Sequence, residues 1–256
     1  MIKFIIDGQI AKLTFDNDKK RNSLNTVMLD EIIEALDRIT NDIRVLIVTA
    51  NKGTKVWSAG FNIEELPHPG LDPLPYDHPL EQVLRKMQEV ECPVIAQIEG
   101  SVWGGAVDLV LRCDILIGTP KTSFAITPAK IGVPYNTSGI MRMLSSLNQN
   151  ITKEMFFTAR PVKAERAYQL GLLNHLVEVD ELHDFVQEMA EHICSNSPLS
   201  IRVIKEQVNI ISNSYPISIN ASEKIDQIRR VAYNSDDYVE GKKAFLEGRK
   251  PDFKGL

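Results

Sequence analysis

The chain has 256 residues and a formal net charge of −5, and 43% of its residues are hydrophobic while 25% are charged. This composition is typical of a folded globular protein, and it excludes the broad basic surface that recruits nucleic acid or an anionic membrane. Three cysteines without a CxxC spacing favour reduced thiols in a cytoplasmic protein over a disulfide framework or a zinc site.

The N-terminal segment predicts a β-hairpin. Asp7 and Gly8 form a turn between two strand-like runs, Lys3–Ile6 and Gln9–Phe15. A basic run at residues 19–21 follows, for which a solvated surface is the default interpretation and contact with a phosphate group is the alternative. We find no signal peptide and no apolar run near the roughly 18 residues of a membrane span, so we expect no membrane partner.

Apolar strands alternate with helical segments through the first half of the chain. Apolar residues at helical spacing predict an amphipathic helix from Thr26 to about Thr40. Continuous apolar runs predict buried strands at Val45–Ala50, Pro93–Ile98 and Ile115–Gly118. Because helical segments separate these strands, we expect βα units with right-handed crossovers in a layered α/β core.

A proline-rich stretch, Leu66–Leu80, interrupts this pattern. It contains five prolines and two histidines. Because proline lacks a backbone N–H, the stretch is not expected to form a regular helix. The pattern leaves two interpretations open, a loop that shapes a ligand pocket and a passive connector.

The C-terminal part of the chain is predicted to be largely helical. The expected elements are helices at Ile151–Ala159 and Ala164–Leu170, a short strand at His175–Val179, and a helix capped by Asp180. Ser197 and Pro198 predict another helix start, since proline is favoured at the first helical position. We therefore divide the chain near residue 196 into an α/β core, 1–195, and a helical oligomerisation or cap region, 196–256.

Two glycine-containing turns follow apolar strands. Gly104 and Gly105 come after the strand at residues 93–98 and open a short helix, whose first N–H groups have no helical acceptor. The segment Ser58–Ile63 follows the strand that begins at Val45. Two such turns can supply two N–H donors to one oxygen, and glycine lets a ligand approach the backbone. A Gly-Gly pair taken alone is more often only a tight turn.

Four segments of the chain, in order, resemble the crotonase family, also called the enoyl-CoA hydratase/isomerase superfamily. These segments are Asn22–Asn25, Ser58–Ile63, Glu99–Ala106 and Glu240–Pro251. The resemblance implies an α/β fold with a crotonase-like ββα spiral core and a C-terminal helical domain. It also implies an acyl-CoA substrate, no separate cofactor, and homotrimers or dimers of trimers.

The resemblance assigns an oxyanion hole to the backbone amides of Phe61 and Gly105. By analogy with other oxyanion holes, each donor stabilises the transition state by ~3–4 kcal/mol. Hydratases of the family add two glutamates, and the matching positions in this chain hold Asp108 and Ala129. Because alanine cannot transfer a proton, and an acid–base group contributes about 10²–10⁴ in rate, efficient hydration is disfavoured. The positions matched to substrate or CoA contacts are Asn22, Ser23, Leu24, Ala59, Gly60, Ile63, Trp103, Gly104, Phe245 and Arg249.

Further segments, Leu71–Leu80 and Ile131–Asn136, resemble the branch of the family that decarboxylates methylmalonyl-CoA. Tyr135 matches a tyrosine that orients the substrate carboxylate, and Thr127 matches a threonine near the same group. A packed loop tyrosine is the alternative for Tyr135. Phe61 departs from this branch, which has a histidine there, but a backbone N–H does not depend on the side chain.

The sequence leaves the role of Asp108 open. In the first turn of a helix its charge can simply complement the helix dipole. Beside an oxyanion hole that charge would oppose a substrate carboxylate, so we expect Asp108 either to turn away or to have a raised pKa and deliver a proton. No metal site is predicted, since His183 and His192 fall on different helical faces.

The sequence thus predicts an acyl-CoA thioester decarboxylase that converts methylmalonyl-CoA into propionyl-CoA and CO2 through an enolate. Loss of CO2 generates the enolate directly, so the reaction requires no base. Enoyl-CoA hydratase is the alternative, with Asp108 or water replacing the missing glutamate. A non-catalytic acyl-CoA-binding protein is the second alternative.

Overall fold

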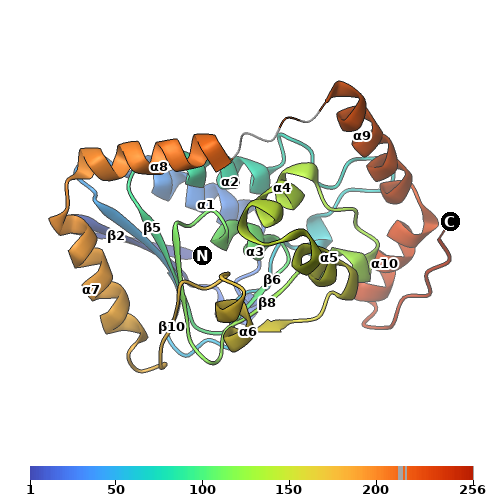
Figure 1. The fold of residues 1–256 in the computed structure, drawn as a ribbon. Helices are drawn as coiled ribbons and strands as arrows, with labels where there is room; N and C mark the ends of the chain where they lie inside the picture. Colours follow the sequence, from blue (N-terminus) through green and yellow to red (C-terminus); the bar gives the residue numbers. More distant parts are fainter. Residues whose placement is uncertain (213–215, 217, 256) are drawn as a thin grey trace.

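The protein folds around two β-sheets, which Figure 1 shows in a computed structural model that describes residues 1–212, 216 and 218–255. The larger sheet has the strand order β1-β2-β3-β5-β7-β10. Its strands are β1 (Ile2–Asp7), β2 (Ile10–Phe15), β3 (Val45–Ala50), β5 (Val94–Ile98), β7 (Ile115–Gly118) and β10 (His175–Leu176). β1 and β2 form the predicted antiparallel hairpin, and the other neighbouring strands are parallel, as expected for βα units.

A second sheet of short strands has the order β4-β6-β8-β9. Its strands are β4 (Val56–Ser58), β6 (Ser101–Trp103), β8 (Ser123–Ala125) and β9 (Val162–Lys163). This sheet was not predicted, because strands of two or three residues are too short to show a periodic pattern. The two glycine-containing turns therefore follow β4 and β6, and not directly the long strands to which they were assigned.

The helices match most of the predicted positions. They are α1 (Thr26–Asp37), α2 (Pro79–Glu89), α3 (Gly105–Val110), α4 (Thr137–Ser146), α5 (Gln149–Thr158), α6 (Ala164–Gln169), α7 (Leu182–Ser195), α8 (Pro198–Ser212), α9 (Ile219–Tyr233) and α10 (Asp236–Leu246). Short 3-10 helices are η1 (Asp18–Lys20), η2 (Ile63–Glu65) and η3 (Pro128–Ile131). The predicted cap at Asp180 is wrong, because Glu181 occupies the N-cap of α7 and makes no side-chain capping bond.

Both faces of the larger sheet are buried at its central strand β3. On β3, Leu46 and Val48 belong to the main hydrophobic cluster, to which α1, α2 and α3 also contribute. Val45 and Ile47 of the same strand belong to a second cluster that includes Leu182 of α7. Because successive side chains of a strand point to opposite faces, α7 covers one face and the main cluster covers the other.

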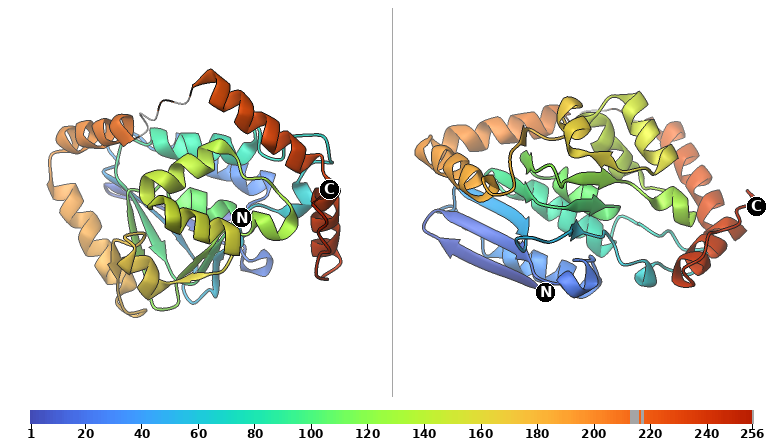
Figure 2. Two further views of the ribbon diagram at one scale, coloured as in Figure 1. Left: turned by 45° about the vertical axis from the view of Figure 1, so that its right-hand side comes forward. Right: turned by 90° about the horizontal axis from the view of Figure 1, so that it is seen from below.

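The C-terminal helices lie at the periphery of the described structure. α8 has no buried residue, and its apolar side chains at Leu199, Ile204 and Ile211 are exposed. The right view of Figure 2 shows α9 and α10 at the end of the molecule opposite the N-terminal hairpin. α10 packs closely on η3, since a Cβ on Gly241 would lie 2.3 Å from the Ile131 carbonyl. The division at residue 196 stays a prediction.

The α/β class and the C-terminal helices are thus as expected. None of the helices in the described ranges is long and apolar enough to cross a membrane. Cys92, Cys113 and Cys194 are free thiols.

Candidate functional site

A cavity of about 70 Å³ lies at the carboxyl edge of the second sheet, and we call it the site cavity. The segments that follow β4, β6 and β8 form its wall, because parallel strands bring their carboxyl ends to one edge. All five residues predicted to be catalytic line the site cavity, namely Phe61, Gly105, Asp108, Thr127 and Tyr135. From the predicted substrate-binding set, Ala59, Ile63 and Gly104 line it as well.

The backbone amides of Phe61 and Gly105 lie close together on this wall. Gly60 has a φ of +83°, and a Cβ there would lie 2.4 Å from the Trp103 carbonyl oxygen and 3.1 Å from the Gly105 nitrogen. A Cβ on Gly105 would lie 3.6 Å from the Phe61 nitrogen. Neither amide donates a hydrogen bond to a protein acceptor in the described part of the chain. Two neighbouring N–H groups of this kind are able to bind one oxygen of a ligand.

A loop near the N-terminus braces the segment around Phe61. The Leu24 amide donates to the residue before Phe61 at 2.8 Å, and the Leu24 carbonyl accepts from the residue after Phe61 at 2.9 Å. The buried Asn22 side chain donates to the Trp57 carbonyl at 3.0 Å, and the Ser23 hydroxyl lies 3.4 Å from the carbonyl preceding Phe61. These side chains therefore serve the protein's own packing, and contact of this loop with CoA stays a prediction.

Tyr135 and Asp108 are hydrogen-bonded to each other inside the protein. The Tyr135 hydroxyl is paired with Oδ2 of Asp108, and both residues are buried. Burial raises the pKa of Asp108, because its charged form would lose hydration. Burial and the nearby Asp108 carboxyl raise the pKa of Tyr135 well above its usual value. Asp108 therefore does not turn away from the site cavity, and its part in proton delivery stays a prediction.

Asp108 belongs to a buried network that the sequence analysis missed. Arg142 donates from Nε to Oδ1 of Asp108 at 3.1 Å and from Nη2 to Oε1 of Glu81 at 3.0 Å. Asn136 and Ser138 also donate to Glu81, at 2.6 and 3.0 Å. Burial alone would raise the pKa of Glu81, but the Arg142 charge and these hydrogen bonds leave it below its usual value. Glu81 lies in the first turn of α2, where an acidic residue is unremarkable, so no local signal marks it.

The proline-rich stretch shapes the site cavity. Leu66, Leu74 and Leu80 line it, which rules out the passive connector of the sequence analysis. His78 lies within the same stretch, and its ring packs edge to face against Phe61 with 4.7 Å between the ring centroids. The aromatic side chain at position 61 is therefore held by packing, while the backbone N–H of Phe61 has no acceptor among the described residues.

Besides Asn22, Ser23, Leu24, Gly60 and Trp103, three further positions named in the sequence analysis do not line the site cavity. Ala129, which replaces the second glutamate of hydratases, is exposed and does not line it. Phe245 is 53% exposed on α10. Arg249 donates to both carboxylate oxygens of Glu240 at 2.6 and 2.8 Å and to Glu247 at 2.6 Å. Contact of Phe245 or Arg249 with CoA stays a prediction.

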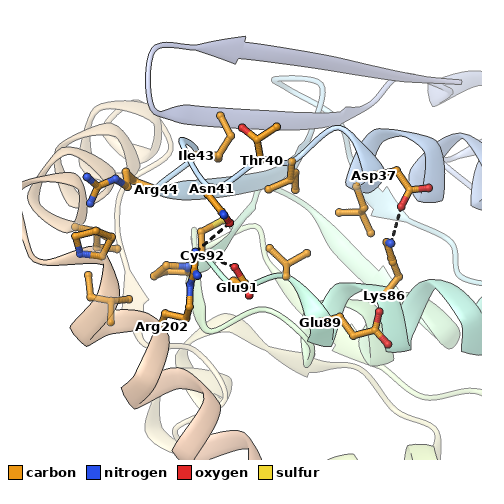
Figure 3. A pocket seen from close by; sticks show the side chains of 17 residues that line it. Asp37, Thr40, Asn41, Ile43, Arg44, Lys86, Glu89, Glu91, Cys92 and Arg202 are labelled. Carbon is orange, nitrogen blue, oxygen red and sulfur yellow. Dashed lines mark hydrogen bonds and ion pairs between the residues drawn. The ribbon is translucent and has the colours of Figure 1, made fainter.

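A second cavity, of about 280 Å³, lies where β3 and β5 begin, as Figure 3 shows. Its charged side chains pair largely with one another. Lys86 contacts Asp37, while Arg202 contacts Glu91 at 2.8 Å and Asn41 at 3.1 Å. None of the predicted site residues lines this cavity. The site cavity is therefore the candidate active site.

Comparisons with known proteins identify the family of the chain. A family model described as enoyl-CoA hydratase/isomerase matches residues 6–256. The chain is 42% identical over 255 residues to methylmalonyl-CoA decarboxylase of Escherichia coli strain K12. The aligned region covers 99% of this chain and 98% of that protein. It is 27% identical over 247 residues to short-chain-enoyl-CoA hydratase of Clostridium acetobutylicum, with 95% and 94% covered. A solved structure of methylmalonyl-CoA decarboxylase in complex with 2-nitronate-propionyl-CoA has a TM-score of 0.97 at 42% identity, and covers 100% of this chain and 98% of that chain.

Proposed function

The chain belongs to the enoyl-CoA hydratase/isomerase family, and from this premise we propose that it decarboxylates methylmalonyl-CoA to propionyl-CoA and CO2. It is a full-length homologue of methylmalonyl-CoA decarboxylase, with the same fold. The observation that carries the proposal is the meeting, in one cavity, of the Tyr135 hydroxyl and two backbone amides that have no acceptor within the described part of the chain.

In the proposed reaction the Phe61 and Gly105 amides hold the thioester oxygen. When the bond to the carboxylate breaks, its electron pair enters the thioester and negative charge develops on that oxygen. Donors already directed at this charge stabilise the enolate, each by ~3–4 kcal/mol. Gly60 permits the arrangement, because a larger residue would collide with the Trp103 carbonyl.

Tyr135 is assigned to the carboxylate that leaves. A hydroxyl donor at this carboxylate would hold it out of the thioester plane, so that the breaking bond aligns with the carbonyl π system. Thr127 lines the same cavity, and we assign it a second contact with this group. After CO2 departs, the carbon that carried it takes up one proton, which we assign to the Tyr135–Asp108 pair.

The dimensions of the site cavity favour a short acyl group. Its volume is only about 70 Å³. Leu66, Leu74 and Val133 give it an apolar wall, against which a methyl group can pack. We therefore expect short acyl groups to be processed in preference to long chains.

Hydration of an enoyl-CoA is the second candidate, because two carboxyl groups, those of Glu81 and Asp108, line the site cavity. Hydration needs one group to activate water and another to supply a proton. Glu81 is poorly suited to activate water, since Asn136, Ser138 and Arg142 already donate to its oxygens. Its lowered pKa also makes it a weaker base, which favours decarboxylation over hydration.

One experiment separates the candidate functions. The purified protein is incubated separately with methylmalonyl-CoA, malonyl-CoA and crotonyl-CoA, and the products are weighed by mass spectrometry. Loss of CO2 from methylmalonyl-CoA supports the proposal, whereas gain of water by crotonyl-CoA would assign the chain to the hydratases. Binding of all three thioesters without turnover would make it an acyl-CoA-binding protein.

We also propose a cytoplasmic location, which the three free thiols favour. For the assembly we propose a homotrimer or a dimer of trimers, with residues 196–256 as the region of contact between copies. Apolar side chains on α8 and α9, among them Ile204, Ile211 and Ile228, are exposed in the single chain, and contact between copies would remove them from water. The molar mass by light scattering tests the assembly, and a monomer at working concentration would reject it.

A further inference from the structure

Glu81 anchors the segment that presents Tyr135 to the site cavity. It accepts hydrogen bonds from Asn136, Ser138 and Arg142, which all follow Tyr135 within seven positions. Asn136 also caps α4, since its Oδ1 accepts from the Gly139 amide at 3.1 Å. One carboxylate on α2 therefore fixes the start of α4, and with it the backbone on the C-terminal side of Tyr135.

Glu81 also competes with Asp108 for a single cation. Arg142 contacts both carboxyl groups, and the side chains of Arg142, Glu81 and Asp108 are only 5–6% exposed. Glu81 has two further donors, whereas the second partner of Asp108 is a hydroxyl, which can either donate or accept. A buried carboxylate without full compensation takes up a proton, so the arrangement favours an ionised Glu81 and a protonated Asp108.

The direction of the Tyr135–Asp108 hydrogen bond determines what Tyr135 can do. A phenol has one hydroxyl proton, and if Asp108 is ionised, the Tyr135 hydroxyl donates that proton in a hydrogen bond to the Asp108 carboxylate. A protonated Asp108 can instead donate to the Tyr135 oxygen, which leaves the Tyr135 proton available to another acceptor. An ionised Asp108 would also repel a second carboxylate in the same cavity.

We propose that Glu81 is a positioning residue for the reaction: by drawing the Arg142 charge to itself, it leaves Asp108 protonated and the Tyr135 hydroxyl free to donate to the substrate carboxylate. This inference rests on the proposed decarboxylation. It goes beyond the family resemblance, which assigned no part to Glu81 or Arg142. Glu81 does not touch the reacting atoms in this scheme, and it acts through Arg142 and Asp108.

The other charged group near Asp108 is Arg112, which follows α3. Burial and the Arg142 charge lower the pKa of Arg112 to about 10, and its Nε has no hydrogen-bond partner within the described residues. Arg112 forms no ion pair with Asp108 there, and its positive charge opposes the effect of Glu81. Burial is the main cause of the raised pKa of Asp108, and the nearby negative charge of Glu81 raises it further, whereas the Arg142 charge lowers it.

The test replaces Glu81 by glutamine, which keeps the size of the side chain and one acceptor oxygen but removes the charge. If only the form with protonated Asp108 is active, kcat/KM falls as pH rises through the pKa of Asp108. Removing the negative charge of Glu81 lowers that pKa, so the high-pH limb of the profile should move to lower pH by at least about one unit. Glu81→Asp keeps the charge and should leave the limb near its original position. Glu154→Gln, at an exposed ion pair with Arg166, is the matched control and should not move it.

A second measurement needs no turnover. In protein labelled with 13C at the aspartate carboxyl carbons, the Asp108 signal is identified by its loss in Asp108→Asn. In the wild type it should titrate well above the ordinary aspartate value of about 3.9, and in Glu81→Gln it should titrate lower. Titration at or below about 4 in the wild type, or the same pH in both proteins, would overturn the inference. If Asp108 titrates as expected but methylmalonyl-CoA is left intact, the proposed function fails while the coupling of Glu81 to Asp108 stands.

Discussion

Arg229 of α9 holds Asp72 of the proline-rich stretch through two hydrogen bonds of 2.8 and 2.6 Å. The Nε of the same guanidinium donates to the Tyr135 carbonyl oxygen at 3.2 Å. One side chain from the C-terminal helices therefore ties down two parts of the cavity wall, since Leu74 lies two residues after Asp72. Both side chains are partly buried, so water screens the attraction between their charges less than it does in a surface ion pair.

Arg229→Lys should weaken both of these connections. Lysine keeps the charge but cannot form the two parallel hydrogen bonds of a guanidinium. We expect the free energy of unfolding to fall by ~1–3 kcal/mol and the kcat/KM of the proposed decarboxylation to fall about tenfold. Chemical denaturation and steady-state kinetics measure the two effects. Arg166→Lys is the control, because Arg166 also makes two hydrogen bonds to one carboxylate, that of Glu154, but on the exposed surface. Equal losses in the two variants would contradict a specific role for Arg229.

Gly60→Ala should abolish most of the activity, and Gly53→Ala should not. Both glycines have a positive φ, +83° for Gly60 and +81° for Gly53, so both variants carry a backbone cost of roughly 1–2 kcal/mol. A Cβ on Gly53 would meet nothing within 4 Å, whereas one on Gly60 would collide with the Trp103 carbonyl beside the Gly105 amide. We expect kcat/KM to fall by at least about 100-fold in Gly60→Ala alone. Thermal unfolding shows whether each variant is folded, and a folded, fully active Gly60→Ala would refute the role of the two amides.

Tyr135→Phe should slow decarboxylation far more than it weakens product binding. Loss of a hydrogen bond to a charged carboxylate costs about 1.5–3 kcal/mol, so kcat/KM should fall by about 10- to 150-fold. Propionyl-CoA lacks that carboxylate, and its Kd, measured by calorimetry, should change by less than about threefold. Tyr238→Phe removes a different hydroxyl, which donates to the Pro67 carbonyl at 3.1 Å, and should not alter the ratio of the two effects. Wild-type activity in Tyr135→Phe would remove Tyr135 from the mechanism.

The stability of the protein should depend on the protonation of His78. Burial lowers the pKa of His78 despite the nearby carboxylates, and its Nδ1 accepts a hydrogen bond from the Leu80 amide at 3.2 Å. The folded state therefore favours neutral His78, and at acidic pH the unfolded chain binds more protons. The resulting stability is complete above the unfolded pKa of about 6.5 and is lost as pH falls through the lower pKa of the folded state.

His78→Asn keeps an acceptor for the Leu80 amide but does not titrate. Between about pH 7.5 and pH 5, the free energy of unfolding of the wild type should therefore fall more steeply than that of the variant. Denaturant titrations at several pH values provide the comparison. Parallel curves for the two proteins would show that His78 is not protonated on unfolding in this range.

The sequence predicted the long elements of the fold because they carry their own pattern. The hairpin around Gly8, the strand Val45–Ala50 and the helix that starts at Thr26 each have apolar residues at the spacing of their secondary structure. The strands of the second sheet are too short for such a pattern. The pairing of β3 with β5 brings the segments that follow them, β4 and β6, side by side. Asp180 resembled a helix cap in the sequence, but α7 begins two residues after it and leaves its side chain unused for capping.

For the site, the sequence supplied positions but not contacts. The motifs around Phe61, Gly105 and Tyr135 are local, so the resemblance to a known family could assign them. The network beneath them is not local, since Arg142 is 34 positions from Asp108 and 61 from Glu81. Such pairs carry no signal in one sequence, because an acidic residue on a helix is common and its partner is known only after folding.

The groups assigned to enolate binding in the site cavity are main-chain atoms, and most mutations change a side chain without removing the main-chain N–H. A mutation at codon 61 exchanges the phenyl ring for another group, yet the N–H persists unless the new residue is proline. The side chains around the two backbone amides, including those at positions 81 and 129, can therefore change during evolution while the amides remain. Descendants of such a scaffold would diverge in the fate of a common intermediate while inheriting the means to form it.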